Sequence, residues 1–193
     1  MPTRTRQISR SAALSGALLR VDLPAIAADL GETGRIFYTD CDVIFRGDIT
    51  PELNAARCDF FSVAPEFTVD DYEQMNTGAM LMQVQPLRAS LSRFRQFIID
   101  EMESLRSDSW DQSAYRRFFR GENGERLWNE LPPTLNWKPY WGQNAAAKII
   151  HFHGPKPFQQ PYIDSHFPEL KHLTGGAYHE MVSLHQALLL EAG

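Results

Sequence analysis

Cysteine, long apolar runs and an excess of positive charge are all lacking in this chain of 193 residues. Only two cysteines occur, without metal-type spacing, which excludes a disulfide-rich scaffold and a cysteine-based zinc module. No apolar stretch is long enough to cross a bilayer, so we expect no transmembrane segment. The formal net charge is -5, and because nucleic-acid-binding domains are expected to be basic, we expect no nucleic-acid partner.

Residues 12–19 have part of the pattern of a secretory signal, because they are small and apolar and follow three arginines. Ser15 and Gly16 interrupt this run and Arg20 follows it directly, so the pattern is incomplete. We therefore expect the three arginines to lie on a solvated N-terminus. The low cysteine content favours a cytoplasmic location, with which peripheral membrane association is still compatible.

Hydrophobic residues make up 43% of the chain and charged residues 22%, which is typical of one soluble globular domain covering residues 1–193. Apolar runs alternate with helical patterns, which favours an α/β architecture. The expected strands cover residues 35–38, 60–64, 79–84 and 148–152. The expected helices cover residues 11–30 with a break near Pro24, 49–56, 87–105, 111–120 and 178–191. Residues 65–74 and 131–141 are expected to be irregular.

Two aspartates, Asp40 and Asp42, come directly after the first expected strand. In an open α/β sheet, ligands bind beyond the carboxyl ends of the strands. Alternate residues of an extended chain point the same way, so both carboxylates can be directed at one point. Two oxygen ligands of this kind suit Mg²⁺ or Mn²⁺ with a phosphate. The alternative is that the aspartates end the strand because they favour turns.

A second group of chemically active residues follows the last expected strand. His151 or His153 can supply an imidazole ligand, which favours Mn²⁺ over Mg²⁺. A turn containing Gly154 then presents Lys156, whose ammonium would neutralise a phosphate. If the strand continues, the two histidines share one face, so the sequence leaves the choice between them open. The alternative is a structural strand end followed by a proline turn.

Four stretches, in this order, resemble the motifs of the family 8 glycosyltransferases, which are retaining enzymes with the GT-A fold. They are RIFYTDCDVI at 35–44, NTGAMLM at 76–82, WDQ at 110–112 and HFHGPKPF at 151–158. Leu19 and Arg20 also resemble a helix whose arginine faces the nucleotide and the metal. The resemblance covers nearly the whole chain, and five motifs in the family's order make it specific.

The resemblance implies a role for each of these residues. Asp40, Asp42 and His151 would hold Mn²⁺ or Mg²⁺ against the diphosphate of a nucleotide-sugar donor. Asp111, Gln112 and Lys156 would be catalytic, and the substrate-binding residues would be Arg20, Asn76, Gly78, Gly154 and Lys156. The implied reaction moves a hexose, from UDP-sugar, to a glycan or lipid-linked acceptor with retention, in polysaccharide biosynthesis. Because an amide is a poor nucleophile, we expect same-face attack by the acceptor rather than a covalent step through Gln112.

The chain also departs from the family pattern. One residue separates Gly154 from Lys156 where the family has two, and Phe158 stands where tryptophan is usual. The family's N-terminal βαβ portion, which holds the base and ribose, has no counterpart here. The expected fold is therefore a Rossmann-like, GT-A-like mixed sheet flanked by helices and truncated at its N-terminus, as a fragment or a shortened product. A missing wall would weaken nucleotide binding and leave a sheet edge open to pairing with another chain, including a homo-oligomer.

Two other functions compete with glycosyl transfer. Haloacid-dehalogenase-type phosphatases also place Asp-x-Asp after a hydrophobic strand, but they require threonine or valine where this chain has Ile44. A degenerate glycosyltransferase-like module would bind a partner or a glycan without activity. Turnover of a generic phosphate ester with Mg²⁺ that Asp40→Asn abolishes would indicate the phosphatase, and calorimetry with UDP and Mn²⁺ separates the transferase from the binding module.

Overall fold

In the computed structural model, which describes residues 18–108, 110–159 and 168–192, the central element is the strand β4 (Met75–Gln83). Eight of its nine residues are buried, because it has strands on both sides and side chains packed on both faces. Met80 and Met82 belong to one hydrophobic core, and Ala79 and Leu81 belong to another. This follows from the alternation of side chains along a strand. The continuous apolar run that predicted a strand here is therefore explained by burial on both faces.

The strands form two sheets. Four of them have the order β1-β4-β3-β5, with β1 (Arg35–Thr39), β3 (Phe61–Pro65) and β5 (Asn129–Glu130). The pairs β1·β4 and β3·β4 are antiparallel and β3·β5 is parallel, so the sheet is mixed. A second, two-stranded antiparallel sheet joins β2 (Val43–Phe45) to β6 (Ile149–His151).

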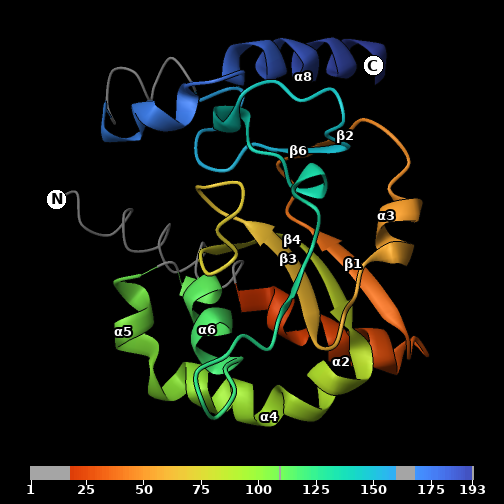
Figure 1. The fold of residues 1–193 in the computed structure, drawn as a ribbon, viewed down its shortest axis with the longest axis vertical. Coiled ribbons are helices and arrows are strands. Elements are labelled where there is room, and N and C mark those ends of the chain that lie inside the picture. Colours follow the sequence, from red (N-terminus) through yellow and green to blue (C-terminus); the bar gives the residue numbers. More distant parts are fainter. Residues whose placement is uncertain (1–17, 109, 160–167, 193) are drawn as a thin grey trace, which may run out of the picture.

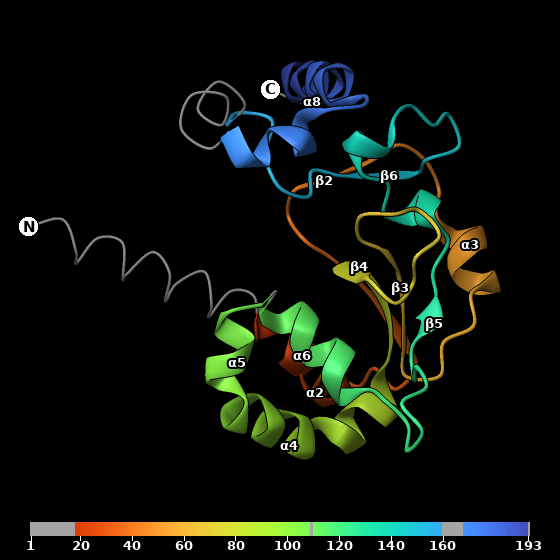
Figure 2. The same ribbon diagram turned by 60° about the vertical axis from the view of Figure 1, so that its left-hand side comes forward.

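The helices lie around these sheets (Figures 1 and 2). The α-helices are α2 (Leu23–Asp29), α3 (Thr50–Ala55), α4 (Val84–Asp100), α5 (Met102–Arg106), α6 (Trp110–Phe118) and α8 (Tyr178–Ala192). The 3₁₀ segments are η1 (Leu19–Asp22), η2 (Pro133–Leu135), η3 (Pro139–Trp141) and η4 (Pro168–Thr174). Both views place α3 and α6 on opposite sides of the large sheet, and α8 beside the β2·β6 sheet, far from α4.

Three hydrophobic cores result. The largest joins one face of β3 and β4 to α4 and α6 and includes Phe61, Met80 and Phe94. A second joins the other face of β4 to the α3 region, and a third joins β2 and β6 to α8. The predicted α/β architecture with a mixed sheet and flanking helices is confirmed.

Several predicted bounds need correction. The strand expected at 79–84 begins at Met75, so the Asn-Thr-Gly motif lies inside β4 rather than in a turn before it. The helix expected at 87–105 is broken at Glu101, where the backbone leaves the helical region at φ -99° and ψ 8°. Pro24 occupies the first turn of α2, which proline tolerates, and the change from 3₁₀ to α geometry falls just before it. The first part of the helix expected at 11–30, residues 11–17, lies outside the described residues, as do the three N-terminal arginines.

Two further features of the fold bear on the predicted partners. None of the helices in the described part of the chain combines the length and the apolar character needed to span a membrane. β1 and β5 are the outer strands of the large sheet. The predicted pairing with another chain would therefore use one of these two edges. That pairing stays a prediction.

The Phe61 ring provides a test of the largest core. It is fully buried, and its centroid lies 5.2 Å from Tyr115 and 5.1 Å from Phe119. We expect Phe61→Ala to lower the free energy of unfolding by about 3–5 kcal/mol, because it removes the ring and leaves a cavity. Urea unfolding followed by circular dichroism measures this. Ile99→Ala on the exposed face of α4 is the control, with an expected change below about 0.5 kcal/mol. Equal losses in both variants would contradict this account of the core.

Candidate active site

The two sheets meet where β1 ends. Asp40 follows β1, and its backbone N–H donates to the carbonyl of Gly78 in β4 over 2.9 Å. Three residues later the chain enters β2, whose first residue, Val43, is paired with His151 at the end of β6. The end of one strand, the start of another and the paired strand thus bring Asp40, Asp42 and His151 together.

The three side chains have one ligand atom each within 4.8 Å of the others. His151 Nε2 lies 3.4 Å from Asp42 Oδ1 and 3.9 Å from Asp40 Oδ2. Asp42 Oδ1 is buried and has no hydrogen-bond partner in the described part of the chain. Burial lowers the pKa of the His151 imidazole, which favours its neutral, ligating form. Two carboxylate oxygens and one imidazole nitrogen fit Mn²⁺ or a similar divalent cation.

Each aspartate uses its second oxygen for a basic or hydroxyl partner. Asp40 Oδ1 accepts from Arg20 over 2.8 Å and from the Tyr38 hydroxyl over 2.5 Å. Asp42 Oδ2 accepts from the Lys156 ammonium. Burial alone would raise the pKa of Asp42, but interactions with its basic neighbours outweigh burial and hold the pKa well below its usual range. Both carboxylates are therefore oriented with one oxygen toward His151.

The structure separates the two candidate histidines. β6 ends at His151, so the strand does not continue to His153 and the condition under which the two histidines would share one face is not met. His153 Nε2 lies 3.2 Å from Glu66 Oε1, and its Nδ1 lies 3.0 Å from the Tyr140 hydroxyl. Both of its nitrogens thus have partners on the other side of the site, and only His151 belongs to the cluster with the aspartates.

Arg20 is the buried cation of the site, with 7% of its surface exposed. Its Nε lies 3.1 Å from Asp111 Oδ2, and one Nη donates to the Thr77 carbonyl over 2.6 Å. The guanidinium carbon also lies 4.8 Å from the centroid of the Tyr38 ring, a cation–π distance. Burial raises the pKa of Asp111, and the charge of Arg20 opposes that shift.

Gly78 allows His151 to lie directly against the backbone of β4. A Cβ at this position would lie 2.1 Å from His151 Cε1 and 2.6 Å from its Nδ1. Gly154 is a turn residue with φ +92°, a left-handed conformation that favours glycine. Both predicted glycines are thus explained by packing and backbone conformation, and their part in substrate binding stays a prediction.

Asn76 and Gln112 are buried close to the same cluster. Gln112 Oε1 accepts from Asn76 Nδ2 over 3.2 Å and from the Thr77 N–H over 3.1 Å. Gln112 Nε2 donates to Glu66 Oε2. The structure therefore brings these two predicted residues into one hydrogen-bonded group with Glu66.

A cavity of about 280 Å³ opens in front of these residues. Arg20, Asp40, Asp111, Gln112, His151 and His153 are among the residues that line it. A larger depression of about 740 Å³ adjoins it, sharing Arg20, Asp40, Asp42 and Lys156. Every residue predicted to bind substrate or metal lines one or both, apart from Gly154, which lies in the turn after His153.

The sequence analysis missed three residues near the site, namely Glu66, Asn136 and Lys138. They fall in segments interpreted as irregular loops, and all three are buried. The Lys138 ammonium donates to the Pro65 carbonyl and lies 4.5 Å from the Trp141 ring centroid. Burial lowers the pKa of Lys138 far more than the charge of Glu66 raises it. Polar residues placed between apolar neighbours, as in Leu135-Asn136-Trp137, were the available signal.

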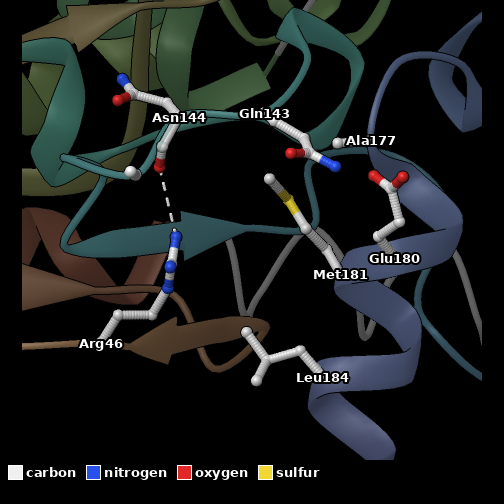
Figure 3. A pocket seen from close by; sticks show the side chains of 8 residues that line it. Arg46, Gln143, Asn144, Ala177, Glu180, Met181 and Leu184 are labelled. Atoms are coloured by element: carbon white, nitrogen blue, oxygen red, sulfur yellow. Dashed lines mark hydrogen bonds between the residues drawn. The ribbon is translucent and has the colours of Figure 1, made fainter.

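A second pocket, of about 240 Å³, lies beside α8 where β2 ends and β6 begins (Figure 3). Arg46 lines it and donates to the Asn144 carbonyl over 3.2 Å, while Glu180, Met181 and Leu184 of α8 form another wall. Glu180 is the one acidic residue among those that line it. A second cluster of carboxylate ligands is therefore not present in this pocket.

No family model matches the sequence, and no curated protein sequence matches it either. Solved structures do match. The glycosyltransferase GlyE of Streptococcus pneumoniae TIGR4 gives a TM-score of 0.58 at 17% identity, over 73% of this chain and 38% of GlyE. The galactosyltransferase LgtC, in complex with donor and acceptor sugar analogues, gives 0.51 at 16% identity, over 80% of this chain and 64% of LgtC.

The mixed sheet and its flanking helices therefore define a glycosyltransferase-like fold of the GT-A type. The chain spans less than two thirds of the length of GlyE and of LgtC. At these sequence identities the likeness concerns the fold, and the arrangement of Asp40, Asp42 and His151 adds a cluster able to hold a divalent cation.

The contact between Gly78 and His151 can be tested directly. We expect Gly78→Ala to lower the free energy of unfolding by about 1–3 kcal/mol, because the new methyl group overlaps a buried ring. Chemical denaturation measures the loss. Gly34→Ala is the matched control, since a Cβ there has no neighbour within 4 Å. If Gly78→Ala were as stable as Gly34→Ala, His151 would not lie against this strand.

The buried ion pair of Arg20 gives a second test. Arg20→Met should lower the free energy of unfolding by about 3–5 kcal/mol, because Asp111 is left as an uncompensated buried charge. Adding Asp111→Asn should restore part of that loss. Arg95→Met removes an exposed pair with Asp22 and should cost less than about 1 kcal/mol. Denaturation of the four proteins measures these effects, and an Arg20→Met variant as stable as Arg95→Met would contradict the role of Arg20.

Proposed function

We propose that the protein is a retaining hexosyltransferase of the family 8 type that uses a nucleotide sugar and Mn²⁺. One observation carries the proposal. Asp40, Asp42 and His151 direct one ligand atom each toward a common point, beside a cavity that also contains Arg20 and Lys156. Cationic side chains beside a metal cluster suit a diphosphate leaving group, and the glycosyltransferase-like fold supports the same reading.

When bound, the cation would supply Lewis acidity toward the departing nucleoside diphosphate. The residues of the chain would bind the phosphate and the sugar and orient the metal ligands. Lys156 lies where its ammonium can exchange its contact with Asp42 for one with a phosphate oxygen, and Arg20 fixes the orientation of Asp40. Asp111 and Gln112 line the inner cavity, where they would hydrogen-bond the hydroxyls of the donor sugar.

Retention by same-face attack agrees with the state of Gln112. Its amide oxygen already accepts two hydrogen bonds and its nitrogen donates to Glu66. An amide held in this way is poorly suited to attack an anomeric carbon. We therefore favour direct transfer to an acceptor hydroxyl, with a UDP-sugar as donor and a glycan or a lipid-linked sugar as acceptor.

One observation favours the non-enzymatic alternative. The Lys156 ammonium contacts Asp42, and an internal cation of this kind could take the place of a metal in a degenerate binding module. Measuring UDP binding with and without Mn²⁺ decides between the two functions, because only the transferase requires Mn²⁺ for nucleotide binding.

Titration calorimetry with UDP, with and without Mn²⁺, tests the proposal. We expect weak binding that requires Mn²⁺, and Asp42→Asn should lower the affinity at least about tenfold, or about 1.4 kcal/mol. Asp70→Asn changes an exposed carboxylate outside the site and should leave the affinity unchanged. Hydrolysis of UDP-glucose or UDP-galactose, followed by NMR of the released sugar, then reports activity and retention. Binding of UDP independent of Mn²⁺ and of Asp42 would overturn the proposal.

A further inference from the structure

We propose that a buried chain of hydrogen bonds holds His151 in the tautomer that carries its proton on Nδ1 and leaves a lone pair on Nε2. The chain runs from the imidazole through three amides to a carboxylate, and its members in order are Asn136, Asn76, Gln112 and Glu66. The inference rests on the proposed metal site, because its purpose is to present Nε2 as a ligand. It makes Asn136 and Asn76 positioning residues for His151.

The first link joins His151 to Asn136. His151 Nδ1 lies 2.8 Å from Asn136 Oδ1, and the Asn136 side chain is fully buried. An amide oxygen can only accept a hydrogen bond, so the imidazole must donate from Nδ1. The proton is then absent from Nε2 of the neutral ring. Asn136 is held beside β6 because the neighbouring Trp137 exchanges backbone hydrogen bonds with Ile149 and His151.

The second link fixes which way the Asn136 amide faces. Its Nδ2 donates to Asn76 Oδ1 over 2.9 Å. The same oxygen accepts from the backbone N–H of Gly78 over 3.1 Å. Turning the Asn76 amide over would place its NH₂ group against two donors, a backbone N–H and an amide NH₂. The backbone of β4 therefore sets the direction of this link.

The remaining links repeat this arrangement. Asn76 Nδ2 donates to Gln112 Oε1, which also accepts from the Thr77 N–H. Gln112 Nε2 donates to Glu66, whose ionised carboxylate can only accept. His153 at 3.2 Å and Arg116 at 4.0 Å place basic groups beside this carboxylate. Two backbone donors and one terminal acceptor thus impose the same direction on every hydrogen bond in the chain.

The direction matters because Asp40 and Asp42 favour the opposite tautomer. Their carboxylates lie 3.9 and 3.4 Å from Nε2 and would attract a proton to that nitrogen. A proton there would block the only ligand atom that His151 offers to the cluster. Metal-binding histidines are generally oriented by a partner on the second ring nitrogen. Here that partner is Asn136, and the Asn136 amide is itself oriented by Asn76, the next member of the chain of hydrogen bonds.

The tautomer is measured in the metal-free protein by two-bond ¹H–¹⁵N correlation NMR of the imidazoles, with His151 assigned from a His151→Gln variant. We expect a protonated Nδ1 and a bare Nε2 in the wild type. Asn136→Leu removes the acceptor, and Asn76→Leu frees the Asn136 amide to turn. Both should move the proton to Nε2 and lower Mn²⁺ affinity about 10- to 100-fold, measured by electron paramagnetic resonance.

Asn76→Asp provides the rescue control, because one carboxylate oxygen still accepts from both Asn136 and Gly78, while the donor to Gln112 Oε1 is the one link that this variant loses. It should keep the Nδ1 proton, whereas a purely structural role of Asn76 would give the aspartate and leucine variants the same tautomer. Asn129→Leu, which removes an amide in β5 that contacts Asp59, should change neither reading. If Asn76→Leu fails to fold, the wild-type spectrum and Asn76→Asp still decide.

Three results would overturn the inference: a proton on Nε2 of His151 in the wild type, loss of the Nδ1 proton in Asn76→Asp, or unchanged tautomer and affinity in Asn76→Leu. Failure of the proposed function looks different. A wild type with the expected tautomer but no Mn²⁺ affinity would leave the hydrogen-bond chain in place and remove its proposed purpose.

Discussion

The interaction on which the site depends is the buried guanidinium of Arg20. It joins η1, β1, β4 and α6 through Asp40, the Thr77 carbonyl and Asp111. Two carboxylates about 4 Å apart near a protein surface repel each other by roughly 4 kcal/mol. The cavity gathers Asp40, Asp42, Asp111 and Glu66, and the basic side chains of Arg20, Lys156 and His153 contact these carboxylates. Of these three side chains Arg20 is the least exposed, and it is the one that compensates two carboxylates at once.

Because basic side chains offset the clustered carboxylates, the two oxygens of each aspartate have different partners. One oxygen of Asp40 and one of Asp42 is taken by a cationic partner, and the other faces His151. The protein can therefore fold without a bound cation and still keep a preorganised set of lone pairs. Lys156 differs from Arg20 in this respect. It is a flexible, partly exposed ammonium with a single carboxylate contact, so it is the cation that can turn toward an anionic substrate.

The sequence was most informative where the chemistry is local. The strand followed by Asp40 and Asp42 depends on neighbouring residues alone, and its position at the sheet edge was predicted correctly. The choice between the two histidines was not predictable, because it depends on where β6 ends. β2 and β5 contain only three and two residues and exist through pairing with distant segments. Glu66 and Asn136 were missed for the same reason, since their contacts join residues 15 to 60 positions apart.

Gln112 shows how long-range contacts change the meaning of a motif residue. By the resemblance alone, its amide stands on the reacting face of the sugar. In the fold, both acceptor positions of its oxygen are used, and one of its two N–H groups is given to Glu66. What is left for a substrate is a single donor. A sugar hydroxyl can accept a hydrogen bond from that N–H, whereas an electrophilic carbon would need the oxygen. The burial of Asn76 and Gln112 in one directed chain therefore links two proposals: a histidine presented to a cation, and a transfer in which the acceptor, rather than the protein, attacks the sugar.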